Sequence, residues 1–136
     1  MGVLIDTCIW IDVERGKLSP ADVQMITGAE PVFISPITIA ELAFGVEITD
    51  SENIKQKRAA ALERLKKKPV LTIDSDTGSI FGRLSAALRM TGRGADFRIQ
   101  DVWIASQAIQ NGFPVLTKNT KDFQDIPGLN LLSIGL

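Results

Sequence analysis

Acidic and amide side chains follow several apolar runs of this 136-residue chain, where they could bind a cation or activate water. Asp6 is the most informative of them, because it follows Val3–Ile5 and precedes the apolar stretch Cys8–Ile11. A carboxylate among nonpolar neighbours costs free energy unless a hydrogen bond or a cation compensates for it. Asp6 is not an obvious helix cap in so apolar a run, so we predict that it binds a divalent cation.

Other candidates follow later apolar runs or begin helices: Ser35, Glu41, Asp101, Thr117, Asn119 and Asp122. Taken singly, they have structural explanations. Glu41 completes a Thr38-x-x-Glu41 capping box, and Asp101 is a first-turn acid of the kind that stabilises a helix start. Asn119 and Asp122 suit a turn. Taken together, carboxylates at one place would repel one another without a cation, and they suit Mg²⁺ or Mn²⁺.

Four further acids have simpler explanations. Asp74 and Asp76 follow an apolar run and are interpreted as loop or cap residues. Asp12 and Asp22 lie in helical patterns, which favours solvated or first-turn positions. None of the four is predicted to take part in the chemistry.

The composition excludes several classes of enzyme. The chain has no His and no Tyr, and Cys8 is its only cysteine. A Ser-His-Asp triad is therefore impossible, a Cys8 nucleophile would lack a His to activate it, and zinc sites of His and Cys are excluded. The lone cysteine also favours a reducing compartment, and we expect a cytoplasmic protein.

The charge and hydropathy of the chain limit its partners. Lys and Arg number 15 and Asp and Glu number 16, so binding to nucleic acid would need a local basic patch rather than bulk charge. No apolar run approaches the length of a membrane span, and the N-terminus lacks the pattern of a signal peptide. We expect no membrane association.

The elements that position the candidate residues alternate along the chain. Continuously apolar runs predict parallel strands covered on both faces; these are Val3–Ile5, Val32–Ile34, Val70–Ile73, Val115–Leu116 and a weaker fifth at Leu129–Ile134. Helical patterns lie between them, starting at Ser19-Pro20, at Thr38, within 51–68, around Ile80–Leu88 and at Val102. The sequence therefore predicts one α/β domain over residues 1–136, with a mainly parallel sheet of four to five strands flanked by helices. In such sheets ligands bind at the carboxyl ends of the strands, where the candidate residues fall.

Four motifs extend this interpretation: "LIDTCIWID", "ISPITIAELAFGV", "IQDVWIASQA" and "VLTKNTKDF". Together and in this order they resemble the PIN-domain ribonucleases, specifically the VapC-like toxins of bacterial toxin–antitoxin pairs. The resemblance covers essentially the whole chain. It implies a three-layer α/β/α sandwich and a Mg²⁺- or Mn²⁺-dependent endoribonuclease that cleaves tRNA, rRNA or mRNA and so inhibits translation. It further implies a homodimer and a VapB-like antitoxin that neutralises the enzyme.

The resemblance also assigns roles to residues. The three acidic positions of the family fall on Asp6, Glu41 and Asp101, and the metal ion would be held by Asp6 and Asp101. The fourth position is Asn119, where many relatives have Asp, and it would act with Glu41 through water. Ile99 stands where relatives often carry another acid, so this site is predicted to be less acidic than is usual in the family.

Residues around the site follow from the same resemblance. Thr7 and Thr117 match hydroxyl positions that orient carboxylates or water, and Ser35 and Asp122 are adjacent candidates. The basic side chains predicted to contact RNA phosphates are Arg98, Lys118 and Lys121, although a solvated surface explains each of them singly. Trp10 and Phe44 either line an antitoxin groove or pack in the core.

Two other classes of function compete with this one. A phospho-receiver domain would need adjacent acids after the first strand, whereas Thr7 follows Asp6 here. A catalytically impaired PIN-like module, which binds RNA or a protein without cutting, is favoured by the amide at Asn119. No G-x-G-x-x-G motif follows a predicted strand, so a dinucleotide site is not expected.

Overall fold

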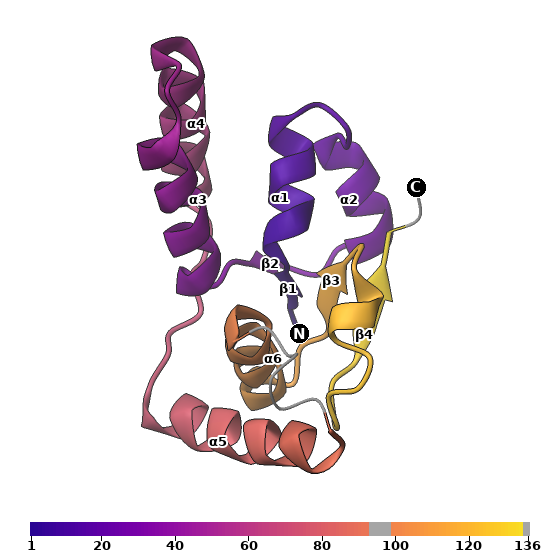
Figure 1. Ribbon diagram of the computed structural model, residues 1–136. Helices are drawn as coiled ribbons and strands as arrows, with labels where there is room; N and C mark the ends of the chain where they lie inside the picture. Colours follow the sequence, from indigo (N-terminus) through magenta and orange to yellow (C-terminus); the bar gives the residue numbers. More distant parts are fainter. Residues whose placement is uncertain (93–98, 135–136) are drawn as a thin grey trace.

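A four-stranded sheet forms the centre of the molecule in the computed structural model, which describes residues 1–92 and 99–134. The strands are β1 (Val3–Ile5), β2 (Val32–Phe33), β3 (Val115–Thr117) and β4 (Leu131–Ser133). They are ordered β2-β1-β3-β4, and every neighbouring pair is parallel. The predicted α/β class with a parallel sheet is confirmed, and the carboxyl ends of β1 and β3 lie side by side (Figure 1).

The apolar run Val70–Ile73 does not form the predicted strand. It makes a single parallel bridge between Ile34 and Val70, with Leu71 N–H donating to Ile34 O at 3.0 Å. The next bond of a parallel ladder would require an N–H at Pro36, and proline has none. Pairing therefore stops there, and the chain at Pro36 turns into a helix instead.

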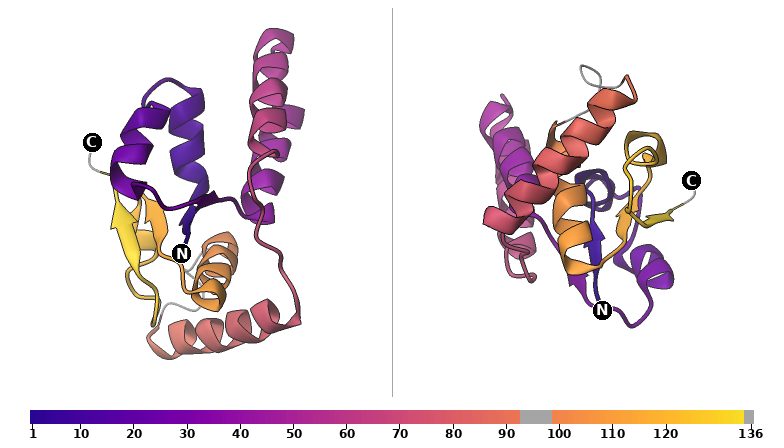
Figure 2. Two further views of the ribbon diagram at one scale, coloured as in Figure 1. Left: turned by 180° about the vertical axis from the view of Figure 1, so that it is seen from behind. Right: turned by 90° about the horizontal axis from the view of Figure 1, so that it is seen from below.

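Helices cover both faces of the sheet and extend beyond one side of it (Figures 1 and 2). Their bounds are α1 Thr7–Glu14, α2 Pro20–Thr27, α3 Pro36–Ile48, α4 Glu52–Leu65, α5 Ser75–Met90, α6 Ile99–Asn111 and the 3₁₀ turn η1 Thr120–Asp122. Helices α3 and α4 pack on each other as a hairpin that projects beside α1. Within the described parts of the chain, no helix is long and apolar enough to span a membrane.

The core is split by the sheet into two layers, as the alternation of side chains along a strand requires. Val3 and Ile5 of β1 pack on one face with Ile9 of α1 and Val23 of α2. Leu4 points to the other face, where residues of α5 and α6 surround it. These two layers and the sheet between them make the three-layer α/β/α sandwich that the sequence predicted.

Helix starts follow local capping chemistry. Ser19 caps α2, which confirms the predicted start at Ser19-Pro20, and Asp74 caps α5, which is one of the two roles expected for it. The predicted start at Thr38 is wrong, because Ser35 is the cap of α3 and Pro36 occupies its first turn. Proline fits this position since its missing N–H would have had no partner in the helix.

Candidate functional site

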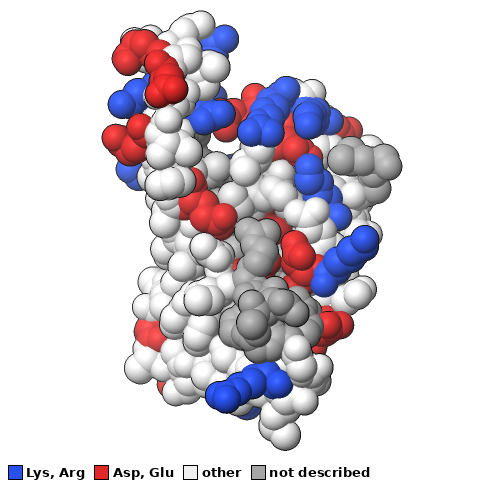
Figure 3. Space-filling view, in the orientation of Figure 1, with Lys and Arg blue, Asp and Glu red and all other residues white. Residues whose placement is uncertain are grey.

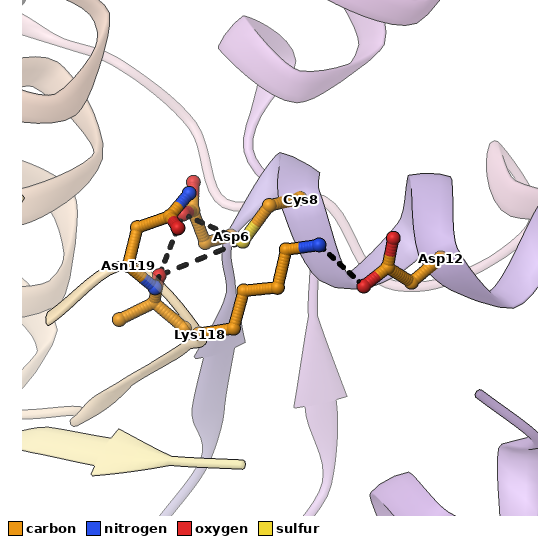
Figure 4. A network of polar contacts seen from close by, with 6 residues as sticks. Asp6, Cys8, Asp12, Lys118 and Asn119 are labelled. Atoms are coloured by element: carbon orange, nitrogen blue, oxygen red, sulfur yellow. Dashed lines mark hydrogen bonds and ion pairs between the residues drawn. The ribbon is translucent and has the colours of Figure 1, made fainter. Parts of the chain in front are cut away.

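Asp6 links β1 to α1 at the carboxyl edge of the sheet (Figure 4). Its side chain is 5% exposed and accepts hydrogen bonds from the Thr7 N–H at 2.8 Å and the Thr117 hydroxyl at 2.9 Å. The Cys8 thiol donates to the same carboxylate at 3.2 Å. Asp6 is also the cap of α1, contrary to the sequence prediction, and the positive end of that helix contributes to stabilising its charge.

Thr7 connects Asp6 to the second predicted acid. Its hydroxyl donates to Glu41 Oε1 at 3.0 Å and lies 2.9 Å from the Thr38 hydroxyl, which must then be the donor in that pair. Thr38 lies inside α3 rather than at its start, so the capping-box interpretation of Thr38 and Glu41 is wrong. One buried hydroxyl pair therefore joins α1 to α3 and holds the Glu41 carboxylate near Asp6.

Asn119 reaches the site through Thr117. The Thr117 hydroxyl, fully buried at the end of β3, accepts from the Asn119 N–H at 2.9 Å while it donates to Asp6. Asn119 is exposed and precedes η1, yet its side-chain amide makes no capping hydrogen bond to that turn. Asp122 ends η1, half-buried, and its N–H donates to Asn119 O.

Asp101 lies in the first turn of α6 and is 3% exposed. Helix α6 ends at Asn111, only a few residues before β3 begins, so its C-terminus is at the amino edge of the sheet and its start is at the carboxyl edge. Contacts of α6 with β1 and α3 place it beside the elements that carry Asp6 and Glu41. Among residues 1–92 and 99–134, however, no three acidic or Cys side chains gather into one metal-binding group.

Ser35 and Gln107 hold the framework behind these acids. The fully buried Ser35 hydroxyl caps α3 at Ile37 N–H and donates to Gln107 Oε1, so its contacts are those of a structural residue. Gln107, also fully buried, donates from Nε2 to Leu71 O at 2.8 Å and to Thr72 O at 3.3 Å. Gln107 was not among the predicted site residues, although a glutamine within the apolar face of the last predicted helix is a detectable signal.

Asp12 was interpreted as solvated or first-turn, and this is wrong. It is 2% exposed, and its Oδ2 is 2.6 Å from Lys118 Nζ (Figure 4). Lys118 directly precedes Asn119. Its ammonium group is held by the Asp12 carboxylate, which belongs to α1. Of the three basic residues predicted to contact RNA, Lys121 is exposed and Arg98 lies outside the described residues.

Cys8 lies against the site without the properties of a nucleophile. Burial, together with the charge of Asp6, raises the pKa of its thiol to about 11. The thiol is protonated at neutral pH, and a protonated thiol is a poor nucleophile. This agrees with the prediction that the chemistry does not run through Cys8.

A groove with a volume of about 1150 Å³ separates α1 and α2 from the α3–α4 hairpin. Apolar side chains of α1, α2, α3 and α4 line it, among them Trp10, Val23, Leu42 and Leu65, and Glu41 is part of its wall. Several basic side chains line it as well: Arg15, Lys57, Arg58, Arg64 and Lys68. Figure 3 shows basic side chains gathered around the upper end of this face. Of the two roles left open for Trp10 and Phe44, Trp10 has both, since it lines this groove and packs against the core. Phe44 has neither, since it is not part of the groove wall and is 65% exposed.

Comparison with known proteins identifies the class of this fold. The PIN domain family matches residues 3–129. Ribonuclease VapC1 of Rickettsia felis is 35% identical over 138 residues, which cover 98% of this chain and 97% of the relative. Two solved structures resemble the chain over 99% of its length. VapBC2 of Rickettsia felis bound to promoter DNA has a TM-score of 0.85 and 22% identity, and all of that chain is covered. VapBC-5 of Mycobacterium tuberculosis, from the VapBC family of toxin–antitoxin systems, has a TM-score of 0.75 and 31% identity, and 98% of that chain is covered.

The chain therefore belongs to the PIN-domain family. Within that family its likeness over the full length is to the VapC ribonucleases, which confirms the resemblance carried by the four motifs. The match also includes the segments that bear Asp6, Glu41, Asp101 and Asn119, all of which lie between residues 3 and 129.

Proposed function

We propose that this chain is a metal-dependent endoribonuclease toxin that hydrolyses phosphodiester bonds of tRNA, rRNA or mRNA, inhibits translation and is neutralised by a cognate antitoxin. The observation that carries the proposal is the hydrogen-bonded network of Asp6, Thr7, Glu41, Thr117 and Asn119 at the carboxyl edge of the sheet. In a member of the PIN-domain family, with VapC ribonucleases as full-length relatives, such a network is best explained as an active site.

The donor atoms available at this edge fit a hard divalent cation. Asp6, Glu41 and Asp101 offer carboxylate oxygens and Asn119 an amide oxygen, which are the ligands that Mg²⁺ and Mn²⁺ prefer. Asp6 and Asp101, both buried, would hold the ion, and Glu41 and Asn119 would act through water. Such an ion supplies positive charge that polarises water and offsets the negative charge that develops on the scissile phosphate.

The chain's own hydrogen bonds prepare this edge for the reaction. The Thr7 N–H and the Thr117 hydroxyl fix the two oxygens of Asp6 in one orientation, so less conformational freedom remains to be lost when a substrate binds. Thr7 also orients Glu41, which places a second carboxylate where it can accept a hydrogen bond from an attacking water. Asn119 is neutral, and its amide can donate to a phosphate oxygen, as a carboxylate at that position could not.

RNA phosphates would be bound by cations at the edge of this site. Lys121 follows Asn119 by two residues and is exposed, so its ammonium group is positioned to contact the backbone of a single strand. Arg98 is proposed for the same role on sequence grounds. Lys118 would have to exchange Asp12 for phosphate, and we therefore assign the contact to Lys121 first.

The antitoxin would occupy the groove between α1, α2 and the α3–α4 hairpin. The groove is lined by apolar side chains and by five basic side chains against three glutamates, so it fits a segment that carries apolar and acidic side chains. Because the groove reaches Glu41, a bound segment would lie beside the site and could exclude RNA from it. The exposed Phe44 and Ile48 on α3 support the proposed homodimer, since apolar side chains are placed at such contacts.

Cleavage of RNA by the purified chain tests the catalytic proposal. With Mg²⁺ we expect cleavage of total cellular RNA at defined positions, loss of that cleavage in EDTA, and a fall of at least 100-fold in Asp6→Asn. Asp76→Asn is the matched control, because Asp76 is an exposed acid of the first turn of α5. Cleavage by Asp6→Asn at the rate of the control would refute the role of Asp6.

A PIN-like module that binds without cutting is the competing function, and the amide at Asn119 favours it. The two functions differ in their use of the cation. An active enzyme should bind Mg²⁺ in a titration that depends on Asp6 and Asp101, and mapping its cleavage sites would name the RNA. A module that has lost activity should bind RNA equally well with and without Mg²⁺.

A further inference from the structure

The ion pair of Asp12 and Lys118 lies near the proposed active site, and the catalytic proposal does not use it. Its carboxylate is buried and its ammonium group is partly exposed. Asp12 lies near the end of α1 and is 2% exposed, and Lys118 is 28% exposed. The distance of 2.6 Å between Oδ2 and Nζ is that of a direct charge-assisted hydrogen bond. A carboxylate so deeply buried requires such a partner, which distinguishes this pair from ordinary surface lysines.

Lys118 stands between two residues that contact the Asp6 network. Thr117 before it donates to Asp6, and Asn119 after it donates its N–H to Thr117. Asp6 is the cap of α1, and Asp12 belongs to the same helix. The segment Thr117–Asn119 therefore contacts both ends of α1 (Figure 4). At the start of the helix, Thr117 bonds to Asp6 and lies 3.6 Å from the Cys8 thiol, and near the end of the helix Lys118 pairs with Asp12.

Contacts at both ends of α1 restrict the segment more than contacts at one end would. With only the contacts of Thr117 to Asp6 and Cys8, the segment could turn about the start of the helix and change the direction in which Asn119 leaves the strand. The Lys118–Asp12 pair is a second attachment, near the other end of the helix. The second attachment opposes such a rotation, since the Lys118 side chain would have to leave a buried carboxylate. Asn119 is an exposed residue whose backbone, with φ −105° and ψ 61°, lies outside regular helix and strand, so contacts from neighbouring residues hold it in place.

We propose that Asp12 and Lys118 are positioning residues, which hold the Thr117–Asn119 segment against α1 and so place Asn119 relative to Asp6. This inference rests on the proposed function for its catalytic consequence, but its structural consequence can be measured separately. It also separates Lys118 from RNA binding, because the ammonium group is used inside the protein. A displacement of about 1 Å at a catalytic group can lower a rate by about 100-fold.

Two readouts on the full chain test the proposal. The first is hydrogen exchange of the Asn119 N–H, measured by NMR without metal or RNA. In Asp12→Asn and in Lys118→Met we expect exchange at least tenfold faster, with the Ile34 N–H unchanged as an internal reference. The second is Mg²⁺-dependent cleavage of a fluorogenic RNA oligonucleotide that spans a mapped site, where kcat should fall at least tenfold and KM stay within twofold.

Further variants separate positioning from stability and from RNA binding. Lys118→Arg keeps the charge and should restore most of both readouts. The double variant Asp12→Asn/Lys118→Met leaves no unpaired buried charge, so it should fold, yet its Asn119 N–H should still exchange rapidly. The matched control is Glu63→Gln/Lys66→Met, which removes an exposed ion pair on α4 and should change neither readout.

The outcomes that would overturn the proposal are distinct from failure of the proposed function. If the wild-type chain does not cleave RNA, the catalytic proposal fails, and the exchange rates alone decide whether the pair positions Asn119. Unchanged exchange in the double variant would overturn positioning. A rise in KM and a weaker salt dependence for Lys118→Met, with Asp12→Asn like wild type, would show that Lys118 binds phosphate instead.

Discussion

Replacing Gln107 by Leu should be among the most damaging single changes to this fold that conserve side-chain volume. Gln107 is fully buried, and its amide joins α6 to the cap of α3 at Ser35 and to the backbone at Leu71. Leucine fills similar space but offers no hydrogen bond. The change leaves the Leu71 carbonyl without its side-chain donor and Ser35 without its acceptor, in surroundings where water is largely excluded.

The expected loss can be estimated from these contacts. An unsatisfied buried polar group costs about 1–3 kcal/mol, and Ser35 retains its bond with Ile37 N–H, so we expect a loss of about 3 kcal/mol in the free energy of unfolding. An entropy of unfolding of roughly 2.1 cal/mol/K per residue gives roughly 0.29 kcal/mol/K for a chain of this length. The melting temperature should therefore fall by about 10 °C.

Urea denaturation and calorimetry of the metal-free protein measure this loss directly. Gln56→Leu is the matched control, since Gln56 is exposed on α4, and surface changes are usually within about 0.5 kcal/mol. Combining Gln107→Leu with Ser35→Ala should give less than the sum of the two single losses, because the variants remove a shared bond. A loss below about 1 kcal/mol for Gln107→Leu would refute the assignment of Gln107 as a buried connector.

Three further predictions concern single residues. Burial holds the pKa of Cys8 at about 11 against an ordinary 9.0, so in EDTA its alkylation rate should keep rising with pH beyond 9; a rate that levels off near 9 would contradict this. The hydrogen bond from the Thr77 N–H lowers the pKa of Asp74 in the folded protein. The stability that Asp74 contributes is therefore present above its unfolded pKa and is lost as the pH falls through its folded pKa. The urea midpoint of Asp74→Asn should decline less in acid than that of wild type. Gly2→Ala would drive a methyl group into the ring of Phe33, which should cost about 1–3 kcal/mol in calorimetry, whereas a neutral result would mean that the ring can move aside.

The architecture was predictable because its signals are local. Four of the five expected strands form, and the pattern of continuous apolar runs separated by helical periods is sufficient to indicate a parallel sheet. Ser19-Pro20 and Asp74 mark helix starts through capping chemistry that depends on a few neighbouring residues. The wrong start at Thr38 has the same origin, since Ser35-Pro36 is an equally local signal for a helix start and lies a few residues earlier.

The wrong predictions for Asp12 and for Val70–Ile73 depend on contacts that no local pattern encodes. Asp12 and Lys118 are 106 positions apart, and nothing near Asp12 indicates that it is buried. The strand expected at Val70–Ile73 could form only if the chain after Ile34 continued to pair with it. After the single bridge of Ile34 with Val70, the chain reaches Pro36, which has no N–H to donate. An N–H at position 36 would have bonded to the Leu71 carbonyl. Because Pro36 has no N–H, Gln107 Nε2 donates to that carbonyl instead. The missing N–H and the buried glutamine are therefore parts of the same arrangement.

The prediction that Asp6 binds a cation needs a stronger argument than burial. Its burial suggested a cation, yet a helix N-terminus and three donors already compensate for part of the cost. Burial alone would therefore not require a metal ion. The stronger reason is that Thr7 and Thr117, which bind Asp6, also bind Glu41 and Asn119. A residue that served only as a cap would have no need of this shared orientation, whereas a site that binds a cation and a phosphate requires several oxygen donors fixed relative to one another.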